Sequence, residues 1–196
     1  MTPNRLNALT DGVVAIVLTI MVLEVKIPAE PTLAAVLAVA PLLAAYLLAF
    51  VNVAIYWNNH HHMVQSARKV TGGVLWANHA LLFWLTLFPL MIRWIDETGI
   101  TPLPVASFGI VLIGASVAYL VLEQTLIRAE GEQSRVKSAV GSGFKEWISF
   151  ALYVASVPAA FVSPYISIAI YVGVSILWLV PDRRFAQQHE GTGGEA

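Results

Sequence analysis

The chain alternates long apolar stretches with short polar connections, a pattern typical of a helical membrane protein. Apolar stretches lie at residues 7–27, 33–57, 73–95, 105–127, 147–163 and 164–180. Four of them are close to the roughly 20 residues that a helix needs to cross a bilayer, and the last two are short. The connections, at residues 28–32, 60–71, 96–104 and 128–146, are too small to hold a soluble domain. The pattern therefore predicts an all-α membrane protein.

The last two apolar stretches decide the number of spans. Residues 147–181 contain no charged side chain, and this segment is too long for one ordinary crossing. Ser163-Pro164 interrupts it, and the residue before a proline is biased away from helix. We therefore predict a tight hairpin of two spans and six transmembrane helices in all. The alternative is one crossing plus a re-entrant segment, which gives five spans.

Basic residues distribute unevenly between the two sides of a six-span chain. One side receives nine of the Lys and Arg residues and the other receives two, Lys26 and Arg93. The positive-inside rule then predicts that both termini are cytoplasmic. We expect residues 1–181 to form one membrane domain and residues 182–196 a disordered cytoplasmic tail. Asp11 interrupts the first stretch, so we expect it to be retained as a span and not cleaved as a signal peptide.

Composition agrees with this class and excludes others. Hydrophobic residues make up 58% of the 196 positions and charged residues 12%, about half the charge density of a soluble domain. Cysteine is absent, which rules out disulfides, thiolate metal sites and a cysteine nucleophile. The net charge is -1 and no basic tract is present, so we expect no nucleic-acid partner. The expected surroundings are the lipid bilayer, with no soluble partner.

The first apolar stretch carries a polar signature at its start and an apolar stripe along its length. Ionisable groups are costly in a membrane helix and so usually have a function. At 3.6 residues per turn, Ile16, Ile20 and Leu23 share one face, with Thr19 at its edge. Such a stripe by itself is what ordinary helix packing produces. Its position directly after a charged signature makes it a candidate functional face.

Arg5 and Asp11 are interpreted as a brace between helices. Asp11 lies about 140° around the helix from Ile16, and Arg5 is outside the spacings at which two side chains on one helix meet. Each therefore needs a partner on another helix, because a buried charge requires compensating hydrogen bonds. Depth in the membrane makes His60 and His61 plausible partners of Asp11, and Asn78 lies at a similar depth in the third span.

Metal binding and catalysis are both disfavoured. Consecutive residues on a helix point about 100° apart, so His60, His61 and His62 cannot converge on one ion without unwinding. No Ser, His and Asp set shares one depth, no nucleotide-binding glycine loop is present, and no acidic residue lies near the middle of a span. We predict no metal, no cofactor and no enzymatic activity. Aromatic residues at span ends, including Tyr56 and Trp178, are interpreted as interfacial anchors.

The motifs together resemble the bacterial branch of the transmembrane protein 175 family, whose animal members are endolysosomal potassium channels. The family begins its first helix with Arg, three residues and Phe-Ser-Asp. Here Arg5 and Asp11 match, while Leu9 and Thr10 replace the aromatic residue and the serine. Further similarity lies in residues 12–28, in residues 57–61 at the end of the second span, and in residues 75–78 and 87–89 of the third. The resemblance covers the first three spans by motif and the rest by topology.

The resemblance implies a homotetramer in the bacterial inner membrane, with a central pore lined by the first helix. Potassium would permeate, and rings of apolar side chains would replace a carbonyl-type selectivity filter, whose Thr-Val-Gly-Tyr-Gly sequence is absent. The matching constriction positions are Ile16, Thr19, Ile20 and Leu23. The matching structural polar network comprises Arg5, Thr10, Asp11, Trp57, His60, His61 and Asn78.

Two other functions remain open at this point. The first is a proton-permeable channel or an ion-coupled carrier that uses Asp11 with His60 and His61 as a relay. The second is a membrane scaffold that transports nothing.

Overall fold

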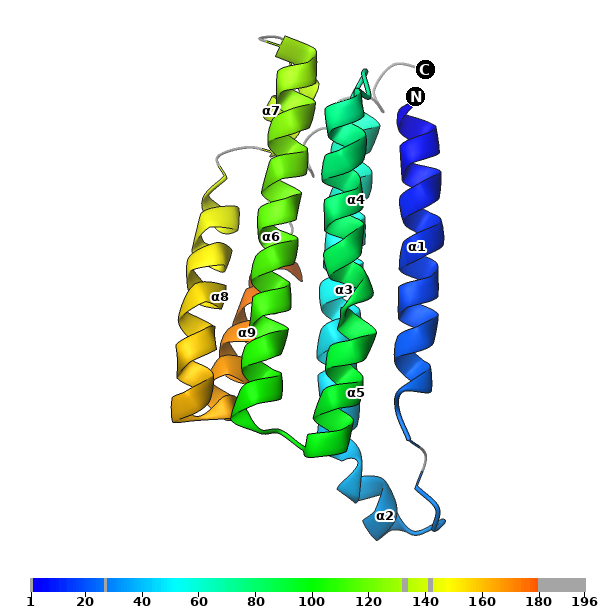
Figure 1. Ribbon diagram of the computed structural model, residues 1–196, viewed down its shortest axis with the longest axis vertical. Coiled ribbons are helices and arrows are strands. Elements are labelled where there is room, and N and C mark those ends of the chain that lie inside the picture. The colour runs from blue at the N-terminus through cyan, green and yellow to red at the C-terminus, as the bar shows by residue number, and fades with distance from the viewer. Residues whose placement is uncertain (1, 27, 132–133, 141–142, 180–196) are drawn as a thin grey trace, which may run out of the picture.

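The computed structural model describes residues 2–26, 28–131, 134–140 and 143–179, and within these residues every regular element is a helix. Figure 1 shows the long helices lying side by side along the longest axis of the molecule. In chain order the helices are α1 (Pro3–Leu23), α2 (Leu33–Ala38), α3 (Ala40–Ser66), α4 (Gly72–Thr86), α5 (Phe88–Thr98), α6 (Pro102–Glu130), α7 (Arg135–Val140), α8 (Phe144–Val162) and α9 (Pro164–Leu179). The all-helical class predicted from the sequence is confirmed. The predicted tail, residues 182–196, lies outside the described residues.

Four helical segments of the described chain are long and apolar enough to cross a membrane: Pro3–Leu23, Ala40–Ser66, Gly72–Thr98 and Pro102–Glu130. The third segment consists of α4 followed directly by α5. Leu87 lies between the two helices, and Pro89 lies in the first turn of α5. Proline has no backbone N–H to donate, so the regular helix is interrupted there. α8, with 19 residues, and α9, with 16, are shorter. The predicted break between them is present, because Ser163 adopts an extended backbone directly before Pro164.

The second predicted span differs from the observed helix at both ends. α2 is a separate helix of six residues, and Pro41 stands in the first turn of α3. At the other end, the connection expected at residues 60–71 is mostly wrong, because α3 continues to Ser66. The polar run that begins at Asn58 is helical as far as Ser66. His60 therefore lies on a rigid helix.

The helices pack into a bundle with α1 at one edge and the α8–α9 pair at the other (Figure 1). α1 packs against α3, α4 and α5, while α6 lies between α4 and α8 and also contacts α9. Two glycines allow close approach to α6. A Cβ atom at Gly114 would lie 2.3 Å from ring atoms of Trp84, and one at Gly109 would lie 2.4 Å from the hydroxyl of Tyr171. These contacts fix α6 at the centre of the bundle.

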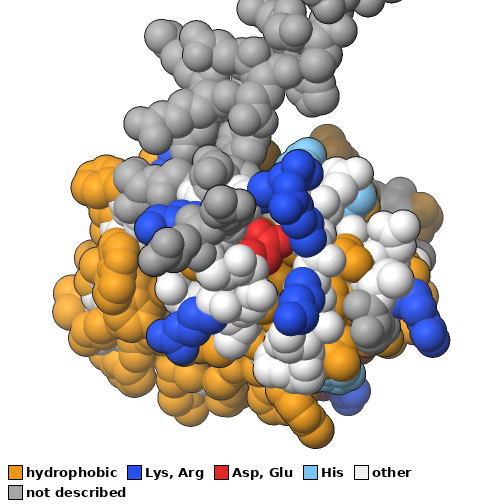
Figure 2. All heavy atoms as spheres, turned by 90° about the horizontal axis from the view of Figure 1, so that it is seen from above, with side chains coloured by type: hydrophobic (Ala, Val, Ile, Leu, Met, Phe, Trp, Pro, Cys, Tyr) orange, Lys and Arg blue, Asp and Glu red, His pale blue; other side chains and the backbone are white. Residues whose placement is uncertain are grey.

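Basic side chains gather at the end of the bundle that carries the N-terminus and α7, which Figure 2 views from above. The two basic residues of the opposite end are each paired with an acid. Lys26 Nζ lies 2.7 Å from Asp96 Oδ2, and Arg93 Nε lies 3.0 Å from Glu97 Oε1. Hydrogen bonding to Asp96 raises the pKa of the exposed Lys26 amine above its ordinary value. The charge asymmetry counted in the sequence is therefore an asymmetry between the ends of the bundle.

Candidate pore face and polar network

α1 has one face packed against other helices and one face that the described residues of the chain leave uncovered. Its buried residues are Leu6, Thr10, Val14, Val17 and Met21. Their spacing of three or four residues places them on one side of the helix, against α3, α4 and α5. This buried side fixes the rotation of α1 about its own axis.

The uncovered face holds the constriction residues that the sequence predicted. The side chains of Ile16, Ile20 and Leu23 are 58%, 42% and 80% exposed. Thr19 is exposed as well, and its hydroxyl donates to the backbone carbonyls of Ala15 and Ile16, each at 2.9 Å. Because the proton of this hydroxyl is directed at the backbone, the oxygen lone pairs remain available to a ligand. The face therefore combines bulky apolar side chains with one hydroxyl oxygen.

A buried polar triad joins α1 to α3 and α4. His60 Nε2 donates to Asn78 Oδ1 at 2.7 Å, and Asn78 Nδ2 donates to Thr10 Oγ1 at 3.2 Å. Thr10 Oγ1 also lies 3.4 Å from His60 Nε2. The exposed fractions of the three residues are 1% for Thr10, 2% for His60 and 0% for Asn78. Three helices are thus tied together at one depth by groups that would be costly to leave unpaired.

Asp11 meets a tryptophan and not a histidine. The indole Nε1 of Trp57 donates to Asp11 Oδ1 at 2.7 Å, so the expectation that His60 or His61 would bond this carboxylate is wrong. His60 is committed to Asn78. His61 instead places its ring 6.0 Å from the ring of Trp57. The rotation of α3 decides this, because adjacent helical residues point about 100° apart.

The remaining members of the predicted network make fewer contacts. Arg5 is exposed, and its side chain makes no hydrogen bond or ion pair within the described part of the chain. Nδ1 of His61 is buried without a hydrogen-bond partner among the described residues. The structure therefore brings together Thr10, His60 and Asn78, and separately Asp11 and Trp57. It does not bring Arg5 to either group.

Sequence comparison assigns the chain to a family. A family model described as endosomal/lysosomal potassium channel TMEM175 matches residues 5–89. A potassium channel of Chryseobacterium sp. (strain P1-3) is 48% identical over 184 residues, which cover 94% of this chain and 96% of the relative. The chain belongs to the TMEM175 family. The resemblance drawn from the sequence motifs is confirmed, and so is the exclusion of enzymes, because the family and its named relatives are potassium channels.

More distant TMEM175 relatives agree with this assignment. A potassium channel of Chamaesiphon minutus is 30% identical over 105 residues, covering 50% of this chain and 52% of that protein. One from Streptomyces collinus is 26% identical over 133 residues, covering 64% and 65%. The crystal structure of a lysosomal potassium-selective channel TMEM175 homolog from Chamaesiphon minutus superposes with a TM-score of 0.79 at 21% identity, covering 90% of this chain and 96% of that one. This superposition confirms the TMEM175 fold.

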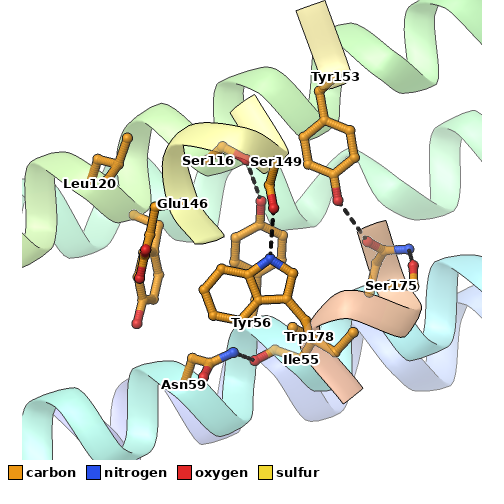
Figure 3. A pocket seen from close by; sticks show the side chains of 12 residues that line it. Ile55, Tyr56, Asn59, Ser116, Leu120, Glu146, Ser149, Tyr153, Ser175 and Trp178 are labelled. Atoms are coloured by element: carbon orange, nitrogen blue, oxygen red, sulfur yellow. Dashed lines mark hydrogen bonds between the residues drawn. The ribbon is translucent and has the colours of Figure 1, made fainter. Parts of the chain in front are cut away.

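The TMEM175 family match and the polar network occupy the same part of the chain. Residues 5–89 contain α1 from Arg5 onward and all of α3 and α4, and with them both hydrogen-bonded groups. Helices α6 to α9 lie outside that match. They contain a feature that the sequence interpretation missed, a cavity among α3, α6, α8 and α9 (Figure 3).

Two aromatic residues predicted to be interfacial anchors line this cavity. The hydroxyl of Tyr56 lies 2.9 Å from Ser116 Oγ, and Trp178 Nε1 donates to Ser149 Oγ at 2.9 Å. The sequence interpretation did not include these contacts inside the bundle.

Proposed function

We propose that this chain is one subunit of a potassium-permeable cation channel in which four copies, each crossing the membrane six times, surround a central pore lined by α1. The observation that carries the proposal is the uncovered apolar face of α1. A single chain leaves Ile16, Ile20 and Leu23 exposed, although the opposite side of the same helix is tightly packed. The potassium-channel names of the relatives, including one that matches nearly the whole chain, support potassium as the permeating ion.

The constriction is hydrophobic in this proposal. Rings formed by Ile16, Ile20 and Leu23 from each subunit narrow the pore below the width of a hydrated ion. An ion then loses water where no carbonyl group replaces it, and a small change in pore width switches the passage between wet and dry. The hydroxyl oxygens of Thr19 form one polar layer between the isoleucine rings. Potassium holds its hydration shell less tightly than sodium, so both features favour potassium.

The polar network holds α1 in register with the rest of its subunit. The triad of Thr10, His60 and Asn78 and the bond between Trp57 and Asp11 both lie on the part of α1 that precedes the constriction. Their role is structural. They fix the rotation of α1, and with it the direction in which Ile16 points.

The channel lies in the bacterial inner membrane with both termini in the cytoplasm. In this orientation the basic end seen in Figure 2 faces the cytoplasm. Lys26 and Arg93, at the other end, are each paired with a carboxylate, which reduces the positive charge that would have to cross the membrane. The hairpin of α8 and α9 supplies the fifth and sixth spans.

Flux through purified protein in liposomes tests the proposal. Potassium, sodium and proton fluxes are compared side by side for the wild type, for Ile16→Ala and for Ile110→Ala. Ile110, on α6, is 50% exposed, close to the 58% of Ile16, and so serves as the matched control. We expect Ile16→Ala to raise potassium flux and lower the preference over sodium, and Ile110→Ala to leave both unchanged. Identical behaviour of the two variants would exclude the constriction.

The same purified protein also distinguishes a channel from a carrier. A carrier with Asp11, His60 and His61 as a proton relay predicts steep pH dependence and turnover far below channel rates. Discrete openings in planar-bilayer recordings support the channel and exclude the carrier. Absence of any flux in correctly oriented, tetrameric protein would instead favour a scaffold.

A further inference from the structure

A cavity lies inside a single subunit, separated from the pore helix by α3. α3 contributes Asn52, Tyr56 and Asn59 to its wall. These side chains lie on a face of α3 roughly a quarter turn away from the face that bonds to α1. Its empty volume is about 480 Å³, a figure that includes the space open to solvent at its mouth.

Most polar groups of the wall bond to one another, and one does not. Asn52 Nδ2 donates to Ser175 Oγ at 3.0 Å, and the hydroxyl of Tyr153 donates to Asn52 Oδ1 at 3.4 Å (Figure 3). Tyr119 is 8% exposed and lines the cavity, yet its hydroxyl has no hydrogen-bond partner in the part of the chain that the structure describes. This hydroxyl is not one of the fully buried polar atoms, so it opens into the cavity and is available to a molecule bound there.

The charge near the cavity is negative. Glu146, at the start of α8, lines the cavity, and none of the lining residues is Lys or Arg. Glu123 lies one helical turn beyond Tyr119 on α6, is 5% exposed, and interacts electrostatically with Glu146. One of its carboxylate oxygens, Oε2, has no hydrogen-bond partner among the described residues. The cavity thus combines an acidic end with aromatic walls, which suits a cation that carries an apolar body.

We propose that this cavity is a binding site for a small organic ammonium compound. The ammonium group donates hydrogen bonds to Glu146 and to the hydroxyl of Tyr119, and the apolar body lies against Tyr56, Tyr153 and Trp178. The rings of Tyr56 and Tyr119, with centroids 6.1 Å apart, add cation–π attraction. The site is built from one chain, so it exists whether or not the assembled protein conducts ions.

Calorimetric titration of the full chain in lipid nanodiscs tests the site, with empty nanodiscs as the blank for partitioning into lipid. The probes are 2-phenylethylamine, which carries the charge at neutral pH, and 2-phenylethanol, which has nearly the same shape without it. We expect the amine to bind at least about tenfold more tightly, because charge-assisted hydrogen bonds are the stronger kind. Equal affinity for the two probes would overturn the proposal.

Variants assign the binding to this cavity. Glu146→Gln should remove the preference for the amine, and Tyr119→Phe, which deletes only the unpaired hydroxyl, should weaken amine binding several-fold. Glu97→Gln is the control, since Glu97 is exposed and pairs with Arg93 at the opposite end. If Glu146→Gln does not fold, Tyr119→Phe decides the matter, and unchanged affinity in that variant counts against the site.

Binding in the pore is the competing outcome, because an organic cation can enter a cation pore. Ile16→Ala separates the two sites. Amine affinity that is unchanged in Ile16→Ala and reduced in Tyr119→Phe supports the cavity. The reverse result locates the amine in the pore and overturns the proposal. Neither titration requires an ion gradient, so a failure of the proposed channel function would leave this result intact.

Discussion

The indole of Trp57 donates a 2.7 Å hydrogen bond to the carboxylate of Asp11, and this bond links the second half of α3 to the first half of α1. It lies at the surface of the single chain, because both residues are exposed. The buried triad of Thr10, His60 and Asn78 lies beside it. The charged group of the signature is therefore held at the rim of the polar network, while neutral groups fill the interior. This arrangement avoids the desolvation of a buried carboxylate.

Removing the bond at Asp11 should affect the assembly more than the ion preference. We expect Trp57→Phe to lower the stability of the folded protein by about 1 kcal/mol, because it deletes a hydrogen bond to a charged acceptor at an exposed site. Asp11→Ala should also reduce the fraction of intact oligomer. The measurements are thermal unfolding in detergent and size-exclusion chromatography with light scattering.

Trp76→Phe is the matched control for Trp57→Phe. Trp76 is 79% exposed and makes no hydrogen bond through its indole among the described residues, so its replacement should leave unfolding unchanged. An intact oligomer of Asp11→Ala with altered potassium over sodium preference would contradict the structural role and give Asp11 a direct part in permeation.

The buried triad should be more costly to break than the exposed bond. Asn78→Leu leaves His60 and Thr10 without their shared partner in a fully buried position, and we expect a loss of about 2 kcal/mol. Thr10→Val keeps the shape and removes one hydroxyl, so its effect should be smaller. Thr86→Val is the control, because the exposed hydroxyl of Thr86 bonds only to a carbonyl of its own helix. Chemical unfolding in mixed micelles ranks the three variants, and equal losses would argue against a triad.

The hydrophobic pattern was sufficient to identify the class and most of the helices. It located the break at Ser163-Pro164, because a charge-free segment of that length and a proline are both visible in the sequence. It misjudged the end of α3, where a run of polar residues including Asn58 and His60 is helical up to Ser66. Hydropathy reports which residues face lipid or the interior of the bundle, and it does not report whether the backbone is helical.

The sequence indicated at which membrane depth the polar residues of the candidate site lie. It did not indicate which neighbour each side chain meets. His60 and Asn78 were placed at the same level of neighbouring spans by depth, and Thr10 by the family resemblance; the structure brings the three together. Trp57 and His61 lie one turn apart on the same side of α3, and the carboxylate of Asp11 is bonded by Trp57, the one nearer the middle of the helix. The cavity was missed for a related reason. Its wall is assembled from four helices, and no single stretch of sequence carries its signature.

Close packing of α6 against α4 should make Gly114 intolerant of a side chain. A Cβ atom there would lie 2.3 Å from ring carbons of Trp84, which is partly buried in the same interface. We expect Gly114→Ala to destabilise the fold by about 1 to 3 kcal/mol through overpacking. Gly173→Ala is the control, because nothing lies within 4 Å of a Cβ at that helical position.

Thermal unfolding of the two glycine variants distinguishes packing from helix propensity. Alanine favours helix over glycine, so Gly173→Ala should be neutral or slightly stabilising. Adding Trp84→Leu to Gly114→Ala should recover part of the loss, because the smaller side chain makes room for the new methyl group. If Gly114→Ala is as stable as Gly173→Ala, α4 and α6 do not approach as closely as the structure indicates.

The number of spans and the orientation can be tested with the chain as it is, because it contains no cysteine. Single cysteines replace exposed residues at the two ends of the bundle, in the variants Thr2→Cys, Arg68→Cys, Glu30→Cys and Glu97→Cys. A membrane-impermeant maleimide added to intact spheroplasts should label Glu30→Cys and Glu97→Cys and leave Thr2→Cys and Arg68→Cys unlabelled until the membrane is opened. A fifth variant, Arg183→Cys, reports on the hairpin of α8 and α9. Protection of this cysteine together with Thr2→Cys requires an even number of spans, whereas labelling from outside would mean that only one of α8 and α9 crosses the membrane.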